Sequence, residues 1–165
     1  MSMNITTKLS IDDYVKVNYH LLYKKWAIKG MTGFGIFFIL LALITLISGP
    51  NFSWFLFIFG LLLTVGLPIQ VYFTAKRNFK SDRRIGEQIE YHFDNQEMQI
   101  VGESFNSRLT WDKIYSVTEN KDWVLIWQNR QIANVVPERD FKVDDLESFK
   151  EIVRTQKGLK NKLKN

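Results

Sequence analysis

The side chains of this sequence best suited to bind a ligand are five basic residues in one short segment. Residues 76–84 contain Lys76, Arg77, Lys80, Arg83 and Arg84. Basic residues beside an apolar segment attract anionic lipid headgroups, at about 1 kcal/mol per residue near the surface. They also have a simpler explanation, because positive charge holds the flank of a membrane span on the cytoplasmic side. We expect both effects, so these five residues are a candidate lipid-headgroup site.

Residue types that catalyse reactions or hold metals are scarce. The chain has no cysteine and two histidines, His20 and His92, and neither lies in an HxxxH or HExxH pattern. No glycine-rich phosphate loop follows a predicted strand, and no GxSxG occurs. The acidic residues Asp144, Asp145 and Glu147 suit the start of a helix better than acid–base work. We therefore predict a protein that is not an enzyme, with no cofactor and no metal site.

The distribution of charge bears on the partners. The chain carries a formal net charge of +5, but residues 85–156 contain eight basic and fourteen acidic residues. Nucleic-acid binding needs a basic folded face, so we expect no nucleic acid. The remaining positive charge lies beside the apolar segment and in the tail, where Lys157, Lys160, Lys162 and Lys164 follow one another closely. Two explanations stay open for this tail: a solvated, disordered end, or contact with anionic lipid.

The apolar segment predicts a membrane hairpin. Residues 30–75 contain no Asp, Glu, Lys, Arg or His, and turn-forming residues interrupt them at 48–51. We predict two transmembrane helices, at about residues 31–48 and 54–75. Twenty-two helical residues span about 33 Å, which matches a hydrocarbon core of about 30 Å. A cleaved signal peptide would begin within the first few residues, and the rest of the chain is too short to bury both helices in a soluble core.

The flanks and the interior of the hairpin predict its orientation and exclude one function. Lys24, Lys25 and Lys29 precede the first span, the five basic residues follow the second, and the loop between the spans has no charge. Both termini should therefore be cytoplasmic and the loop external. Pro68 predicts a kink, and Gly30, Gly33 and Gly35 allow close helix approach, although without the GxxxG spacing. Ion or proton transport would need ionisable groups in the spans, so we expect an anchor.

The cytoplasmic parts read as one strand, then several strands and a helix. Residues 4–9 predict a strand, and Ser10 with Asp13 resembles a capping box at the start of an amphipathic helix. That helix is predicted from residue 11 to about 29, continuing towards the first span. After the hairpin, alternating patterns predict an antiparallel meander of six strands, at residues 88–94, 97–101, 105–111, 113–119, 123–128 and 131–136. A last helix presents the apolar residues Val143, Leu146, Phe149, Ile152 and Val153 at helical spacing and should cover one face of the sheet.

Several of these stretches resemble a known family. They are IDDY at 11–14, SRLTWDKI at 107–114, ENKD at 119–122 and VPERDF at 136–141, in order around two apolar spans. The chain resembles the YcxB-like family of small bacterial membrane proteins. The resemblance implies a pleckstrin-homology-like (PH-like) domain: a bent antiparallel sheet of about six or seven strands closed by a C-terminal helix. Residues 4–9 would supply the seventh strand, and Lys142 departs from the family's Ser-type helix cap.

The expected organisation has four parts. Residues 1–29 form a cytoplasmic strand and amphipathic helix, 30–75 the two spans, 85–157 the YcxB-like domain and 158–165 a basic tail. We expect an α-helical membrane hairpin with an α+β domain, in a multi-pass protein of the bacterial inner membrane.

The resemblance carries no activity, so the function stays an expectation. We expect the protein to be a membrane-anchored, non-catalytic binding or regulatory module on the cytoplasmic face, with a protein, peptide or lipid partner. The alternative is an accessory subunit of a larger membrane assembly such as a transporter. A homo-oligomer is compatible with either function.

Overall fold

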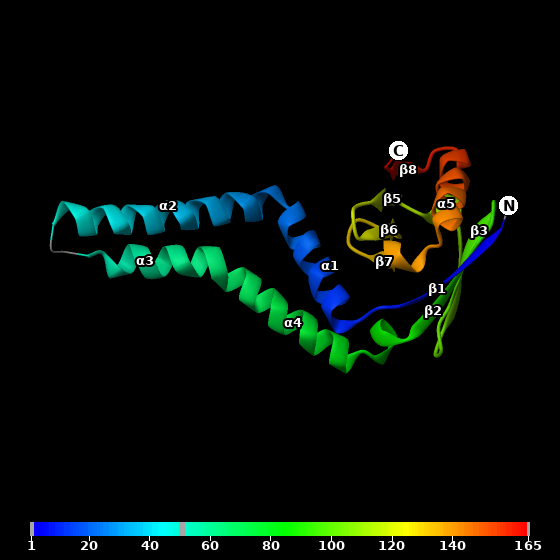
Figure 1. The fold of residues 1–165 in the computed structure, drawn as a ribbon, viewed down its shortest axis with the longest axis horizontal. Coiled ribbons are helices and arrows are strands. Elements are labelled where there is room, and N and C mark those ends of the chain that lie inside the picture. The colour runs from blue at the N-terminus through cyan, green and yellow to red at the C-terminus, as the bar shows by residue number, and fades with distance from the viewer. Residues whose placement is uncertain (1, 50–51, 165) are drawn as a thin grey trace. The chain divides into compact units, whose positions relative to one another are not determined.

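The computed structural model describes residues 2–49 and 52–164, which form two compact units (Figure 1). The helical unit comprises Ser10–Arg83. The β unit combines the residues up to Leu9 with those from Arg84 onward. The β unit is therefore discontinuous in sequence, because the whole helical unit is inserted after its first strand.

The helical unit starts with α1 (Ile11–Lys24) and α2 (Trp26–Ser48). The predicted capping box is present, since the Ser10 side chain accepts from the Asp13 amide and the Asp13 side chain accepts from the Ser10 amide. The prediction that the first helix continues to about residue 29 is wrong. Lys25 has an extended backbone (φ −77°, ψ 120°), so α1 ends there and α2 begins. This break turns the chain so that α1 packs against α4 while α2 packs against α3.

The second apolar segment is longer and less regular than predicted. It consists of α3 (Trp54–Leu61), a π-helical turn (Leu62–Gly66) and α4 (Leu67–Ser81). Pro68 has no amide hydrogen to donate to the carbonyl four residues earlier, which favours a local change of helix type. The predicted kink thus takes the form of a π-helical turn just before Pro68, and Figure 1 shows α4 bending away from α3 there.

Two helical segments are long and apolar enough to cross a membrane, judged by length and composition. They are Trp26–Ile47 and Trp54–Ser81. The second has 28 residues, or about 42 Å at 1.5 Å per residue. Under the predicted topology, the cytoplasmic end of this segment therefore extends beyond a hydrocarbon core of about 30 Å.

The first sheet of the β unit has the order β1-β2-β3-β4, and neighbouring strands are antiparallel. Its strands are β1 (Met3–Lys8), β2 (Gln88–Phe93), β3 (Glu97–Val101) and β4 (Asn106–Thr110). Strand β1 precedes the helices, yet it pairs along its whole length with β2, from Met3 opposite Phe93 to Lys8 opposite Gln88. The strand predicted before the hairpin thus joins the strands that follow it.

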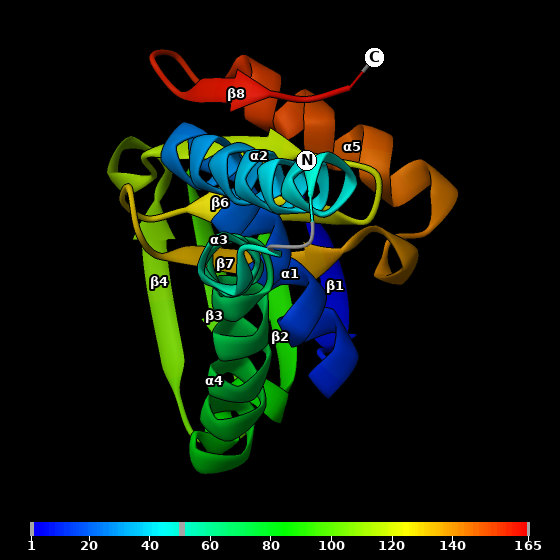
Figure 2. The ribbon, with the colours of Figure 1, turned by 90° about the vertical axis from the view of Figure 1, so that its left-hand side faces the viewer.

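The second sheet has the order β7-β6-β5-β8. Its strands are β5 (Ser116–Glu119), β6 (Trp123–Trp127), β7 (Ala133–Pro137) and β8 (Lys160–Lys162). The expectation of a single bent sheet is wrong, because the meander divides between β4 and β5. The 3-10 turn Trp111–Lys113 lies there and interrupts the strand pairing, and buried Trp111 donates its indole N–H to the Asp94 carbonyl in the β2–β3 turn. Figure 2 shows β2–β4 running across the direction of β6 and β7.

The core of the β unit lies between the two sheets and α5 (Val143–Thr155). Phe149 of α5 contacts Phe93 and Phe141 edge-on, at centroid distances of 4.9 and 5.7 Å. Lys142 provides no side-chain cap, and Asp144 and Asp145 complement the positive end of the helix instead. The predicted core helix is therefore present. Further buried members of the core are Ile5, Met98, Trp111, Val117, Ile126 and Val136.

Candidate functional site

The helical unit exposes most of its apolar surface. Only 11% of the most apolar window of Trp26–Ile47 is buried, and only 6% of that of Trp54–Ser81. The exposed side chains are large: Trp26, Phe34, Leu40, Ile47, Phe55, Ile58, Leu62 and Phe73. The core helices of a soluble protein would be mostly buried, whereas soluble monomers rarely expose large contiguous apolar patches. This surface is suited to an apolar surrounding.

Helices α2 and α3 touch where both have a glycine. A Cβ atom added to Gly60 of α3 would lie 2.7 Å from the Gly35 carbonyl oxygen of α2. A Cβ on Gly35 would lie 2.8 Å from the Gly60 carbonyl oxygen. Of the three glycines predicted to permit close approach, Gly35 does so, while Gly30 and Gly33 have no neighbour within 4 Å of a built Cβ. The sequence pattern did not indicate Gly60, because its partner lies in the other helix.

The five basic residues lie at the end of the second segment. Lys76, Arg77 and Lys80 belong to α4, and Arg83 and Arg84 to the following 3-10 turn (Arg83–Gly86). All except Lys76 are exposed. The Lys76 ammonium bonds to the Tyr72 hydroxyl and lies 4.3 Å from the centre of its ring. An ammonium held on a tyrosine is a typical interfacial arrangement, because both groups join an apolar body to a polar tip.

Helical spacing divides α4 into two faces. Ile69 and Phe73, both exposed, share one face with Lys76 and Lys80, so that face changes from apolar to basic along the helix. The change from apolar to basic matches the passage from acyl chains to headgroups. The predicted lipid-contact residues are thus assembled on one helix and the turn after it.

The opposite face of α4 is covered by α1. The Tyr19 hydroxyl donates to the Pro68 carbonyl at 2.9 Å, and the rings of Tyr14 and Phe79 lie 6.0 Å apart. Ala75 is fully buried. On α1 itself, every fourth residue is exposed and polar, in the series Asp12, Lys16, His20 and Lys24. His20 therefore belongs to a polar helix face.

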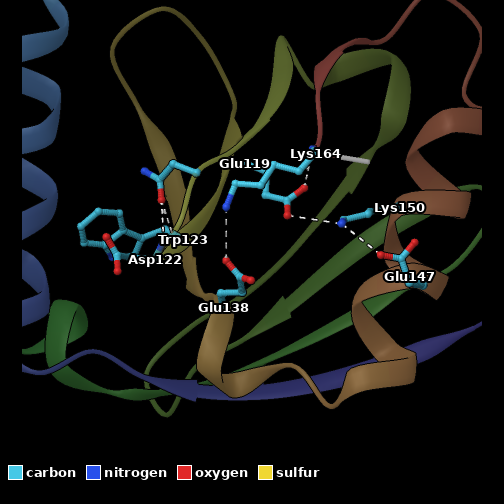
Figure 3. Close-up of polar contacts among 8 residues, drawn as sticks. Glu119, Asp122, Trp123, Glu138, Glu147, Lys150 and Lys164 are labelled. Carbon is cyan, nitrogen blue, oxygen red and sulfur yellow. Dashed lines mark hydrogen bonds and ion pairs between the residues drawn. The ribbon is translucent and has the colours of Figure 1, made fainter.

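The β unit contains a buried ion pair that sequence reasoning missed. The Lys150 ammonium of α5 lies 3.3 Å from Glu119 Oε1 and 3.0 Å from Glu147 Oε1 (Figure 3). The side chains of Lys150 and Glu119 are 4% and 1% exposed. Burial by itself lowers the pKa of Lys150, but the hydrogen bonds to Glu147 and Glu119 outweigh it and raise the pKa overall. The signal in the sequence was the position of Lys150 on the apolar face of its helix, one turn after Leu146.

The basic tail is attached to this ion pair. Glu119 Oε2 accepts the Lys164 amide hydrogen at 2.9 Å, and the Lys164 ammonium lies 3.9 Å from Glu138 Oε2. Arg154 of α5 donates to the Lys164 carbonyl at 3.2 Å. Figure 3 shows Lys164 reaching both Glu119 and Glu138. Lys164 is therefore held by contacts with Glu119, Glu138 and Arg154.

Strand pairing and apolar contacts hold the rest of the tail. Gly158, at φ 83°, turns the chain after α5, and β8 then pairs in parallel with β5. Leu159 and Leu163 are half-buried against the core. Of the two explanations left open for the tail, a disordered end does not match this structure, because pairing with β5 and partial burial of two leucines order the chain. Contact with lipid remains the other prediction for these residues.

The β unit contains His92 and, beside the end of α5, a hollow. His92 Nδ1 lies 2.7 Å from Asn4 Oδ1 across the β1–β2 pair, on the face away from the core. Among residues 2–49 and 52–164, no three His, Asp or Glu side chains are grouped to hold a metal. A shallow hollow of about 440 Å³ lies beside the end of α5, and its lining is Gln96, Trp111, Asp112, Thr155, Gln156 and Lys157.

The comparisons with known proteins concern this β unit. Residues 93–153 match the family model described as YcxB-like protein, which confirms the predicted resemblance over these residues. They run from the end of β2 to the last turns of α5. No curated protein and no solved structure matches the chain.

Proposed function

Starting from a β unit whose residues 93–153 are YcxB-like, we propose that this protein is a non-catalytic binding or regulatory module anchored to the cytoplasmic face of a bacterial membrane. Its helical unit spans the bilayer twice. The observation that carries the proposal is the apolar surface of α2, α3 and the start of α4 that the chain leaves uncovered. In lipid these exposed apolar side chains contact acyl chains, and the backbone N–H and C=O groups of each helix are already hydrogen-bonded within the helix.

The topology of the sheet supports the orientation. Strands β1 and β2 lie on either side of the helical unit in sequence and pair with each other in one sheet. A hairpin whose two ends lead into the same sheet must return to the side from which it started. Basic residues flank both ends and are absent from residues 30–75, which favours the cytoplasm for that side.

We further propose that the β unit is a PH-like fold in which the bend separates the expected sheet into two. Four antiparallel strands are followed by three more and then by a closing helix, α5. The unit displays strand edges and shallow hollows, a surface better suited to holding an extended partner than to enclosing a substrate. The proposed work of the unit is therefore recognition.

Cysteine labelling tests the anchor cleanly, because the chain has no cysteine of its own. Gly49→Cys places a thiol in the loop, where a Cβ meets no neighbour within 4 Å, and Ser2→Cys places one before β1. In intact cells, a membrane-impermeant maleimide should label Gly49→Cys alone, and Ser2→Cys should react only after permeabilisation. Labelling of Ser2→Cys from outside would overturn the topology, and recovery of the chain without detergent would overturn the anchor.

Photo-crosslinking separates a binding module from an accessory subunit. A crosslinker at Gln131, exposed in the turn between β6 and β7, reports on partners of the β unit, and one at Leu40, exposed on α2, reports on partners in the bilayer. The proposed module gives a discrete adduct from positions on the β unit. If Leu40 gives an adduct while neither Gln131 nor any other exposed position scanned on the β unit does, the result would support the accessory-subunit alternative instead.

A further inference from the structure

The ordered tail presents a basic strip at the edge of the second sheet. Lys157, Lys160 and Lys162 are exposed, and all three side chains of β8 face solvent. The Lys160 ammonium lies 5.8 Å from the centre of the exposed Tyr115 ring. A lysine strip bordered by a tyrosine has the composition of a surface that meets lipid headgroups.

This strip is held rigidly. The backbone of residues 160–162 is paired with β5, and Leu159 and Leu163 pack against the core. Lys164 contacts Glu119 and Glu138. A disordered tail would lose conformational freedom when it met a membrane, whereas this one is ordered by folding itself. The ammonium groups of Lys160 and Lys162 are thereby held at one edge, and Lys157 lies in the turn before them, beside Gln96 and Trp111.

The remainder of the folded β unit has the opposite charge. Residues 85–156 contain eight basic and fourteen acidic residues, and with Lys8, Arg84 and Lys164 the unit outside the strip carries a net charge of −3. An anionic leaflet repels most of this surface and attracts the strip, so charge alone selects one edge of the unit for contact. Short connections, Leu9 and Ser10 before α1 and residues 82–87 after α4, keep the unit near the proposed membrane, so the contact is effectively intramolecular.

We propose that the strip formed by Lys157, Lys160 and Lys162 docks the β unit on the anionic headgroups of the leaflet that its own helices enter. This inference rests on the proposed membrane anchor. Docking orients the unit, with β8 towards lipid and the acidic surface towards the cytoplasm. Each lysine contributes about fivefold to the ratio of docked to undocked molecules.

The test uses the full chain in lipid nanodiscs, with fluorophores on single introduced cysteines. Asn161→Cys reports on β8, and Gln131→Cys, exposed in the β6–β7 turn, is the matched control. The quencher is a nitroxide on a lipid headgroup. With 30% phosphatidylglycerol we expect strong quenching at position 161 and little at 131. Quenching at 161 should fall in pure phosphatidylcholine and in 1 M NaCl, because screening removes the attraction.

Charge-matched variants identify the strip as the cause. K160Q/K162Q should lower the docked-to-undocked ratio at position 161 by about 25-fold, about fivefold for each lysine removed. K121Q/R130Q, which removes the same charge from exposed positions elsewhere on the unit, should leave the ratio within about twofold of the parent. Equal effects of the two double variants would overturn the proposal.

A third position distinguishes failure of this inference from failure of the anchor. Leu40→Cys on α2 should be quenched by acyl-chain nitroxides in both lipid mixtures. If Leu40 is quenched while position 161 is no closer to headgroups than 131, the docking proposal is wrong and the anchor stands. If Leu40 is not quenched, the anchor fails and the docking proposal fails with it.

Discussion

Lys8 and Gln88 lie opposite each other at the end of the β1–β2 pair, although the entire helical unit separates them in the chain. Strand β1 contributes buried side chains to the core in addition to forming an edge strand of the first sheet. Met3 and Ile5 are buried in the core, and the buried Thr7 hydroxyl bonds to Asp140 beyond β7. The β unit therefore combines residues from before and after the helical unit.

The first prediction concerns this discontinuity. A chain in which a short Gly/Ser linker replaces residues 10–83 should fold in water without detergent, because Lys8 and Gln88 are already adjacent. Residues 84–165 alone should be markedly less stable, because they lack Met3, Ile5 and the pairing partner of β2. Thermal unfolding followed by circular dichroism compares the two. Equal melting temperatures would show that β1 is dispensable.

The second prediction concerns the contact between the spans. Gly60→Ala would force its methyl group against the Gly35 carbonyl and the Ile39 amide nitrogen, which lies 2.9 Å from the built Cβ. We expect the hairpin to lose about 1–3 kcal/mol of stability, as for other overpacked sites. Gly33→Ala is the control, because its Cβ meets nothing within 4 Å. Unfolding in mixed micelles with increasing SDS measures both, and a similar loss in the two variants would refute a specific Gly35–Gly60 contact.

The third prediction concerns the buried ion pair. Lys150→Met removes the cation paired with the buried Glu119 carboxylate, which keeps the hydrogen bond from the Lys164 amide, and this should cost about 3–5 kcal/mol. Adding Glu119→Leu should restore much of this loss, because no charge then remains unpaired. Glu147→Gln, at an exposed position, should cost less than about 1 kcal/mol. Urea unfolding of the linker-joined β unit gives the free energies, and strictly additive losses for Lys150 and Glu119 would contradict their coupling.

The fourth prediction concerns acid. Asp94 accepts the amide hydrogens of Glu97 and Gln96 at 2.8 and 2.6 Å, and these bonds hold its pKa below the ordinary value of 3.8. Its contribution to stability is therefore present above about pH 3.8 and is lost as the pH falls through the pKa of the folded state.

Asp94→Asn should accordingly be less stable than the parent at neutral pH, and the difference should shrink as the pH falls below 3.8. Urea midpoints across this range follow the change. The pKa of Glu87 is also lowered, chiefly by the Ser104 side chain, so the Asp94→Asn variant itself keeps some acid sensitivity. A constant difference between Asp94→Asn and the parent at all pH values would rule out the carboxylate as its source.

Much of this molecule was predictable from the sequence, because local patterns determine local structure. Residues 30–75 without charge predicted two long apolar helices, the strands from β1 to β7 were predicted within a few residues but β8 was not, and the stripe around Phe149 predicted the last helix. Ser10 and Asp13 predicted the start of α1 for the same reason, since a capping box needs only neighbours in the chain.

Contacts between distant segments were decided by the tertiary structure. The division into two sheets falls at the 3-10 turn of Trp111, whose indole bonds to the distant Asp94 carbonyl, and the order of the tail depends on the free edge of β5. Gly60 matters only because Gly35 lies against it, and Lys150 is tolerated in the interior only because Glu119 is there to pair with it. Spacing along the chain shows which residues share a face of one helix or strand. Which faces then pack against each other depends on tertiary packing, because the contacting residues are far apart in sequence.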